Sequence, residues 1–197
     1  MKGLLVGVGA IFGLGLILIL FYMGAYNGLV SRQENVNEKW SQVQNDYQRR
    51  ADLIPNLVNT VKGVAQFEKD TLREVVEARA RVGSIQMTPE ILNNPQQFKQ
   101  FEAAQGQLTQ ALSRLMVVVE KYPDIKATAN FSELQSQLEG TENRITVARR
   151  DFNLALKEYN TSVRSFPTSV IAGMSGFKEK AYFEATAGSE KAPEVKF

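Results

Sequence analysis

LLVGVGAIFGLGLILILFYM, residues 4–23, is the stretch that decides how this chain is organised. It carries no charge, and Leu, Ile, Val, Phe and Gly make up most of it. A helix rises about 1.5 Å per residue, so a run of this length spans the roughly 30 Å hydrocarbon core of a bilayer. The stretch predicts a transmembrane anchor at residues 1–25, followed by a helical body at residues 26–185. Residues 186–197, with Gly188, Pro193 and scattered charges, are predicted to form a disordered tail.

A cleaved signal peptide is the alternative interpretation of this stretch. Signal peptides have an apolar core of about 7–15 residues, followed by small residues at the cleavage site. Here the apolar run is longer and ends in bulky side chains, and Gly24 and Ala25 form the only cleavage-like pair. The chain has no Cys, which excludes lipoprotein processing. We therefore favour a retained anchor.

Glycines in and just after the anchor form three pairs whose members are four residues apart. The pairs are Gly3 with Gly7, Gly9 with Gly13, and Gly24 with Gly28. Small residues at this spacing share a helix face and let two helices approach closely within lipid. The pattern favours self-association, so we expect a homo-oligomer.

The charges that flank the anchor bear on its orientation. Lys2 is the only basic residue before it, whereas Arg32 and Lys39 follow within the range that counts for the positive-inside rule. This excess predicts a cytoplasmic C-terminal body. The opposite orientation, with Lys2 inside, stays open as an alternative.

The composition restricts the chemistry open to this chain. With 23 basic and 21 acidic residues the formal net charge is +2, so no basic field for nucleic acid is present. The absence of His and Cys removes the usual general base, the usual zinc ligands and every Ser-His-Asp triad. No phosphate-binding glycine loop follows a strand pattern either. We predict a protein that is not an enzyme, with no catalytic residue, cofactor or metal.

Apolar residues after the anchor recur at alternating spacings of three and four, the heptad pattern of coiled coils and helical bundles. One such stretch continues the anchor over residues 36–82, a second covers residues 98–122, and a third covers residues 131–166. Asn94 and Pro95 are suited to the start of the second, while Pro123 and Pro167 end the second and third. The pattern predicts an all-α, up-and-down bundle of long antiparallel helices: three long ones plus a short C-terminal one, or four.

Two features of the first heptad stretch need a structural explanation. Pro55 interrupts it; we favour a kinked helix in which the ring displaces the Ala51 carbonyl, and the alternative is a reversal with Asp52 capping a new helix. Three positions of its apolar seam are charged, namely Arg50, Glu68 and Arg79. A buried charge without a partner is costly, so we expect these side chains to be paired or to lie at an open edge.

The segment after Pro167 changes character. Ile171, Met174, Phe177 and Phe183 are apolar at near-helical spacing, and glycines stand at positions 173 and 176. We expect a short amphipathic element that closes the bundle. The alternatives are that it contacts a neighbouring copy or lies on the membrane surface.

Three separated motifs in this chain are similar to those of a known family. YNGLVSRQENVNEKW from Tyr26, RRADLIPNLVNTVKG from Arg49, and the long run from Tyr122 to Pro167 resemble the LemA family of bacterial membrane proteins. The resemblance implies a single-pass protein of the bacterial inner membrane with an N-terminal membrane helix, a short and mostly extracytoplasmic N-terminus, a helical-bundle body and no established activity. Many members carry a His where this chain has Phe67, so a metal-binding or acid–base role that rests on that His does not transfer to this chain.

The motif residues of the resembled family map onto polar positions here: Arg50, Asp52, Pro55, Asn56, Glu142, Asn143, Arg144, Arg149, Asn153, Tyr159, Asn160 and Pro167. We interpret them as packing residues. Asn153 and Asn160 are seven residues apart, so they share a helix face and are expected to bond to a neighbouring helix. The alternative interpretation is a polar groove for a partner.

Together these features predict a membrane-anchored, non-enzymatic scaffold or adaptor that presents a helical bundle to protein partners as yet unknown. One alternative is a membrane-tethered envelope enzyme or peptidase-like protein that uses carboxylate or Lys chemistry. Another is a lipid-binding or membrane-shaping protein.

Overall fold

The computed structural model describes residues 2–63 and 68–184, so the predicted tail at residues 186–197 lies outside the described residues. Within those ranges the chain is helical and contains no strand. The elements are α1 (Lys2–Lys62), α2 (Lys69–Gly83), the 3-10 turn η1 (Pro89–Asn93), α3 (Pro95–Val119), α4 (Pro123–Lys126), α5 (Ala129–Arg164) and α6 (Thr168–Ser175). The prediction of an all-α protein is confirmed.

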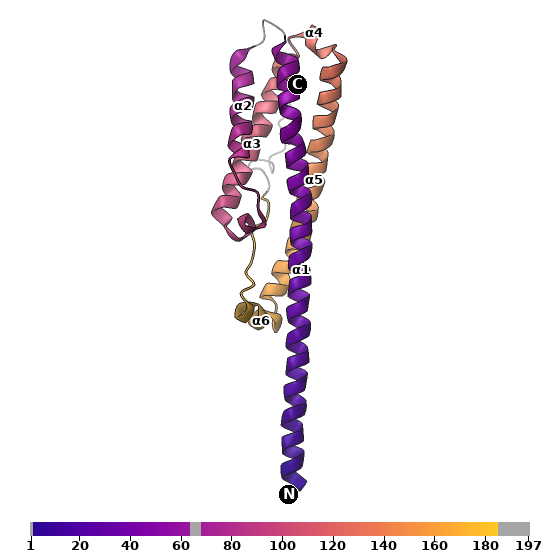
Figure 1. Ribbon diagram of the computed structural model, residues 1–197, viewed down its shortest axis with the longest axis vertical. Coiled ribbons are helices and arrows are strands. Elements are labelled where there is room, and N and C mark those ends of the chain that lie inside the picture. Colours follow the sequence, from indigo (N-terminus) through magenta and orange to yellow (C-terminus); the bar gives the residue numbers. More distant parts are fainter. Residues whose placement is uncertain (1, 64–67, 185–197) are drawn as a thin grey trace, which may run out of the picture.

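The four longer helices form an up-and-down bundle, to which α1 contributes its C-terminal half (Figure 1). Helix α1 packs most extensively against α5, and α2 packs most extensively against α3, so the bundle consists of two helix pairs. The N-terminal half of α1 projects beyond the body as a single rod. No other described helix is long and apolar enough to cross a membrane, and none of the most apolar part of α1 is buried.

Helix α1 ends earlier than the heptad pattern suggests. We expected one helix through residues 36–82, but α1 ends at Lys62 and α2 runs back antiparallel to it. The continued helix is therefore a wrong prediction, and Glu68 is exposed rather than part of a seam. An apolar stripe keeps its phase through a reversal, so periodicity alone does not distinguish the two arrangements. Gly63, directly after Lys62, is the local signal for the helix end.

Pro55 lies inside α1, which continues through it, so the alternative of a reversal at Asp52 is wrong. Proline has no amide hydrogen and leaves the carbonyl four residues earlier without its helical donor. Here the Arg79 Nε on α2 donates to that Ala51 carbonyl at 2.9 Å. A charged seam residue thus replaces the hydrogen bond that Pro55 removes.

Helix ends follow the expected capping chemistry, with two differences. The Asn94 side chain accepts hydrogen bonds from the first backbone amides of α3, as predicted. Helix α3 ends at Val119, however, before Pro123, which instead begins α4. Helix α5 ends at Arg164, so Phe166 is not a seam residue and its side chain is exposed.

The core consists of two apolar clusters stacked along the bundle. The cluster nearer the projecting part of α1 is aromatic: the Trp40 ring lies 5.5–6.1 Å, centroid to centroid, from Phe98, Phe101, Phe152 and Phe183. The far cluster is largely aliphatic and contains Ile54, Leu57, Val61, Val75, Leu108, Leu115 and Leu138. Between the two, α1 contributes the buried charge of Arg50.

Candidate functional site

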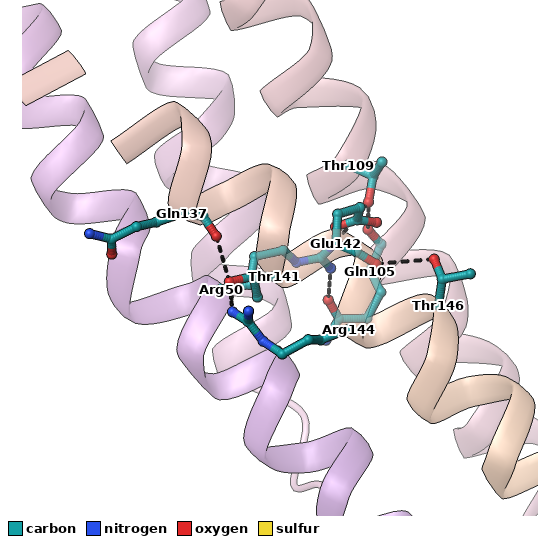
Figure 2. Close-up of polar contacts among 8 residues, drawn as sticks. All are labelled: Arg50, Gln105, Thr109, Gln137, Thr141, Glu142, Arg144 and Thr146. Atoms are coloured by element: carbon teal, nitrogen blue, oxygen red, sulfur yellow. Dashed lines mark hydrogen bonds and ion pairs between the residues drawn. The ribbon is translucent and has the colours of Figure 1, made fainter. Parts of the chain in front are cut away.

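A buried arginine and its partners form a polar layer across the bundle. Arg50 on α1 is only 2% exposed, and its guanidinium donates to Thr109 Oγ1 at 3.0 Å, to Glu142 Oε2 at 2.8 Å and to Gln105 Oε1. The four residues, here called the Arg50 layer, come from three helices (Figure 2). Two of them, Arg50 and Glu142, were predicted from sequence, and the structure brings them together.

The Arg50 layer extends from the core to solvent. The Glu142 side chain is 46% exposed, so the ion pair joins a fully buried cation to an anion at the bundle surface. Two N–H groups of the layer, Arg50 Nε and Gln105 Nε2, have no acceptor among the described residues. A cleft of about 160 Å³ between α3 and α5 reaches the layer and is otherwise lined by three apolar and three polar side chains: Leu112, Met116, Leu138, Ser113, Gln135 and Glu139. The arrangement fixes the register of three helices and neutralises a buried charge.

A second polar cluster holds the C-terminal end of the described chain. Residues 177–184 are extended and run along α5; we call this segment the strap. Asn160 Nδ2 donates to the Lys180 carbonyl at 2.9 Å, and Asn160 Oδ1 accepts from the Lys180 amide at 3.0 Å. Asn153 makes the same pair of bonds with Phe183, both at 3.0 Å. The strap is therefore bonded as in a β-ladder, but to side-chain amides.

The spacing of the two asparagines matches the repeat of the strap. Seven helical residues cover about 10.5 Å at 1.5 Å each, and three extended residues cover about 10 Å at 3.3 Å each. Asn160 and Asn153 can therefore bond Lys180 and Phe183 without distorting either segment. The prediction that they bond to a neighbouring helix is wrong, because helix backbones already use their amides and carbonyls internally and an extended segment offers both.

Further contacts hold the strap at both ends. The Tyr159 hydroxyl donates to the Lys178 carbonyl at 3.0 Å. The Arg149 guanidinium donates to the Glu184 carbonyl at 3.1 Å and lies 4.5 Å from the centre of the Phe183 ring. Phe183 itself is buried in the aromatic cluster around Trp40. The family-motif residues on the second half of α5 thus act on the strap.

Ionisable groups in and beside the strap have shifted pKa values, among them Lys180 and Glu102. Partial burial raises the pKa of the Glu102 carboxyl, and a hydrogen bond from the Glu184 amide and the Arg149 charge oppose that shift. Burial lowers the pKa of the Lys180 ammonium, opposed by Glu90. The Lys180 Nζ donates to Asn93 Oδ1 in η1 at 2.5 Å. Sequence reasoning missed Glu102, since nothing in its spacing marks a carboxylate that meets the strap.

The remaining motif residues on the helices lie at the surface. Asp52, Asn56 and Arg144 line an open groove between α1 and α5, which also includes the buried Asp46. Arg144 Nε lies 3.6 Å from Asp46 Oδ1, and its guanidinium donates to Thr141 Oγ1 at 2.6 Å. Asn143 is exposed and does not line this groove. Apart from Pro55 inside α1 and the exposed Asn143, the family-motif residues on the long helices therefore divide among three places: the Arg50 layer, the strap and this surface groove.

The glycine pairs of α1 differ in their surroundings. A Cβ atom built at Gly7, Gly9, Gly13 or Gly24 would meet no atom within 4 Å, so these positions are open. Gly28 is covered by the Arg32 side chain, whose guanidinium donates to the Gly28 carbonyl at 3.2 Å. Gly3 lies in the first turn of α1.

Among the side chains that the structure describes, no three carboxylates are grouped as a metal site.

The chain is similar to several curated bacterial proteins. It is 31% identical over 176 residues to the magnetosome protein MamQ 2 of Paramagnetospirillum magneticum, a match that covers 81% of this chain and 64% of MamQ 2. It is 30% identical over 181 residues to MamQ of Magnetospirillum gryphiswaldense, covering 83% of this chain and 66% of that protein. Protein LemA of Metamycoplasma hominis is 23% identical over 170 residues, covering 86% and 74%. The chain thus spans slightly less than two thirds of the MamQ relatives.

The exposed apolar part of α1 and these relatives together indicate a membrane-anchored bacterial protein. The family model for LemA matches residues 39–197, which includes the Arg50 layer, the strap and the surface groove. The match begins beyond the apolar stretch, so it concerns the helical body. The chain belongs to the LemA family.

Proposed function

We propose that this protein is a non-enzymatic membrane scaffold that holds a stiff helical bundle at a fixed position on the bilayer and presents it to protein partners. The observation that carries the proposal is the continuity of α1. One helix includes both the exposed apolar stretch and one of the four long helices of the bundle, with no break between them.

The junction between anchor and body supports a stiff connection. Leu29 is fully buried against the body only six residues after Met23, the last residue of the apolar stretch. Tyr26 packs edge-on against Phe177, with ring centroids 5.7 Å apart. A flexible linker would let the body rotate freely, whereas a continuous helix couples its orientation to the tilt of the anchor. Such coupling suits a protein that positions others.

The use of the polar residues supports a non-catalytic role. Arg50 and Glu142 neutralise one another, and Asn153 and Asn160 satisfy the backbone of the strap. Catalytic groups need free bonding capacity that is directed at a substrate. The surface groove beside Arg144 is one region that presents exposed polar side chains to a partner.

Site-specific photocrosslinking in native membranes tests the scaffold role. A photoreactive residue in place of Asn56, in the groove, is expected to give discrete adducts identifiable by mass spectrometry. Val117, which is exposed on α3, provides the matched control position. Failure of the Asn56 position to capture any protein, including a second copy of this chain, above the level seen at Val117 contradicts the scaffold proposal.

Self-assembly through the anchor forms a separate part of the proposal. Gly9 and Gly13 are open to an approaching helix, so replacing both with Leu should weaken a homo-oligomer in mild detergent. Gly15→Leu is the control, since Gly15 lies about 200° around the helix from Gly13. A monomeric unmodified protein, or equal losses in both variants, contradicts association through this face.

We also propose that the protein resides in the inner membrane with its body in the cytoplasm, on the basis of Arg32 and Lys39 after the span against Lys2 before it. A reporter fused after Phe197 and active only outside the cytoplasm should stay inactive. Activity of that reporter reverses the assignment.

A further inference from the structure

The short helix α6 has two apolar faces. Ile171 and Ala172 are buried against the bundle and close its end, as the sequence suggested. On the outside, Val170 and Met174, four residues apart, are 53% and 78% exposed, and Phe166 in the turn just before the helix is 84% exposed. Closing the bundle therefore accounts for only one of the two faces.

The outer face also lacks charge. Residues 166–177, FPTSVIAGMSGF, contain no ionisable side chain. Exposed water-facing segments of a soluble helix normally carry Lys, Glu or Arg, and a stripe of large apolar side chains without charge usually lies against an apolar partner. The chain therefore leaves an apolar surface at this point that needs an occupant.

The position of α6 along α1 identifies that occupant. The Tyr22 hydroxyl lies 3.3 Å from Ser175 Oγ, and the Tyr26 ring packs on Phe177. These tyrosines stand at the end of the apolar stretch that begins at residue 4, about 20 residues or roughly 30 Å along the helix. If residues 4–23 fill the hydrocarbon core, α6 lies at the level of the lipid headgroups, where Tyr side chains are common. In Figure 1, α6 is the part of the body next to the projecting rod.

We infer that residues 166–177 form an interfacial foot, which inserts Phe166, Val170 and Met174 into the surface of the same bilayer that α1 crosses. The inference rests on the proposed anchoring of α1 but not on the scaffold role. The foot gives the body a second attachment beside the anchor. Ile171 joins the foot to the core. The foot therefore fixes how deeply α1 lies in the bilayer and prevents the body from turning about the axis of the anchor.

Basic side chains border the foot and suit this location. Lys178 follows it directly and is exposed, and Arg164 precedes it with its guanidinium 3.8 Å from Glu179. Lys and Arg at such a border extend toward phosphate groups while their stems stay among apolar atoms. The insertion itself depends on the apolar side chains, so it should not require anionic lipid.

Spin-label accessibility in vesicles tests the foot directly. The chain contains no Cys, so a single introduced Cys is labelled uniquely in the full-length protein. Val170→Cys and Met174→Cys, reconstituted at low protein density in phosphatidylcholine vesicles, should be several-fold more accessible to dissolved oxygen than to a water-soluble nickel chelate. Val117→Cys on α3, also an exposed apolar position, should show the reverse ratio. Substituting exposed side chains leaves the core intact, and circular dichroism verifies the helix content.

One further label and a second lipid composition make every outcome decisive. Leu16→Cys, in the apolar stretch, reports the anchor: a water-accessible label there refutes the anchoring, whereas lipid exposure at Leu16 with water exposure at Met174 refutes the foot alone. Protection of Met174 only when phosphatidylglycerol is added refutes insertion driven by apolar side chains. Protection that appears only at high protein density, with dipolar broadening between labels, identifies a second copy as the occupant and likewise overturns the inference.

Discussion

Replacing Asn160 with Ala should release the strap. Asn160 is 1% exposed and makes two hydrogen bonds with Lys180, which is itself 9% exposed. The substitution leaves a buried amide and a buried carbonyl without partners, at about 1–3 kcal/mol for each group. Allowing for partial access of water to the strap, we expect the variant to lose about 2–4 kcal/mol of the free energy that keeps the strap closed. A loss of that size corresponds to opening of the strap that is about 30- to 1,000-fold more frequent.

Hydrogen exchange of the full-length protein in detergent micelles measures this opening. Amides of residues 178–184 should exchange faster in Asn160→Ala, while those in the middle of α5 should keep the rate of the unmodified protein. Asn143→Ala is the matched control, since it makes the same substitution at an exposed position of the same helix. Surface substitutions of this kind usually change stability by less than about 0.5 kcal/mol.

Asn160→Asp separates the donor of the side-chain amide from its acceptor. An aspartate can still accept from the Lys180 amide, but it cannot donate to the Lys180 carbonyl when ionised. Exchange of the strap, corrected for the intrinsic effect of pH, should therefore slow as this carboxyl is protonated. Unchanged exchange of residues 178–184 in Asn160→Ala, or an equal increase throughout α5, would show that the asparagine does not hold the strap.

Three further predictions concern stability, measured by denaturant unfolding in detergent. Glu142→Gln should lower the free energy of unfolding by about 1–3 kcal/mol, because the buried Arg50 charge loses its anionic partner. The cost stays moderate because the Glu142 side chain is half exposed, so a loss above that range contradicts this reasoning. Arg79→Met should cost about 1 kcal/mol, and less in a Pro55→Ala background, where a helical amide again reaches the Ala51 carbonyl; equal costs in both backgrounds refute the replacement. The folded-state pKa of Glu102 is raised, so the stability that this carboxyl contributes is fully present below its usual pKa of 4.5 and is lost as pH rises through the folded-state pKa. The free energy of unfolding of the unmodified protein should therefore exceed that of Glu102→Gln by less as pH rises through this range. A difference that grows with pH contradicts the raised pKa.

The bundle was predictable because the regular spacing of apolar residues along each helix shows which face packs in the core. Phe131, Ile145, Phe152 and Tyr159 of α5 repeat at heptad-compatible spacings, and all four are buried. The cap at Asn94 was predictable too, since a side-chain oxygen in that position has one preferred use. Such local signals depend on neighbours in sequence and need no knowledge of the rest of the chain.

The reversal after Lys62 and the partners of the polar residues were not predictable in the same way. The heptad phase continues from Val61 to Val75 whether the chain turns or not, so only Gly63 pointed to the helix end. Arg50 was recognised as a charge in a seam, but its acceptors lie 55, 59 and 92 residues away. Asn153 and Asn160 were assigned to one face correctly, yet helical spacing says nothing about whether that face meets a helix or an extended segment.

The strap and the proposed foot are consecutive in the chain, which links events at the membrane to the core. Phe177 ends the foot and begins the strap, and it packs on Tyr26 of α1. The Tyr159 hydroxyl donates to the Lys178 carbonyl and lies 3.4 Å from Gln33 Oε1 of α1, so α1, α5 and the strap meet at one side chain. Five residues after Lys178, Phe183 enters the aromatic cluster around Trp40. A force that lifts the foot from the bilayer would therefore act on these contacts, and on the burial of Ile171 in the core, before it reaches the Arg50 layer.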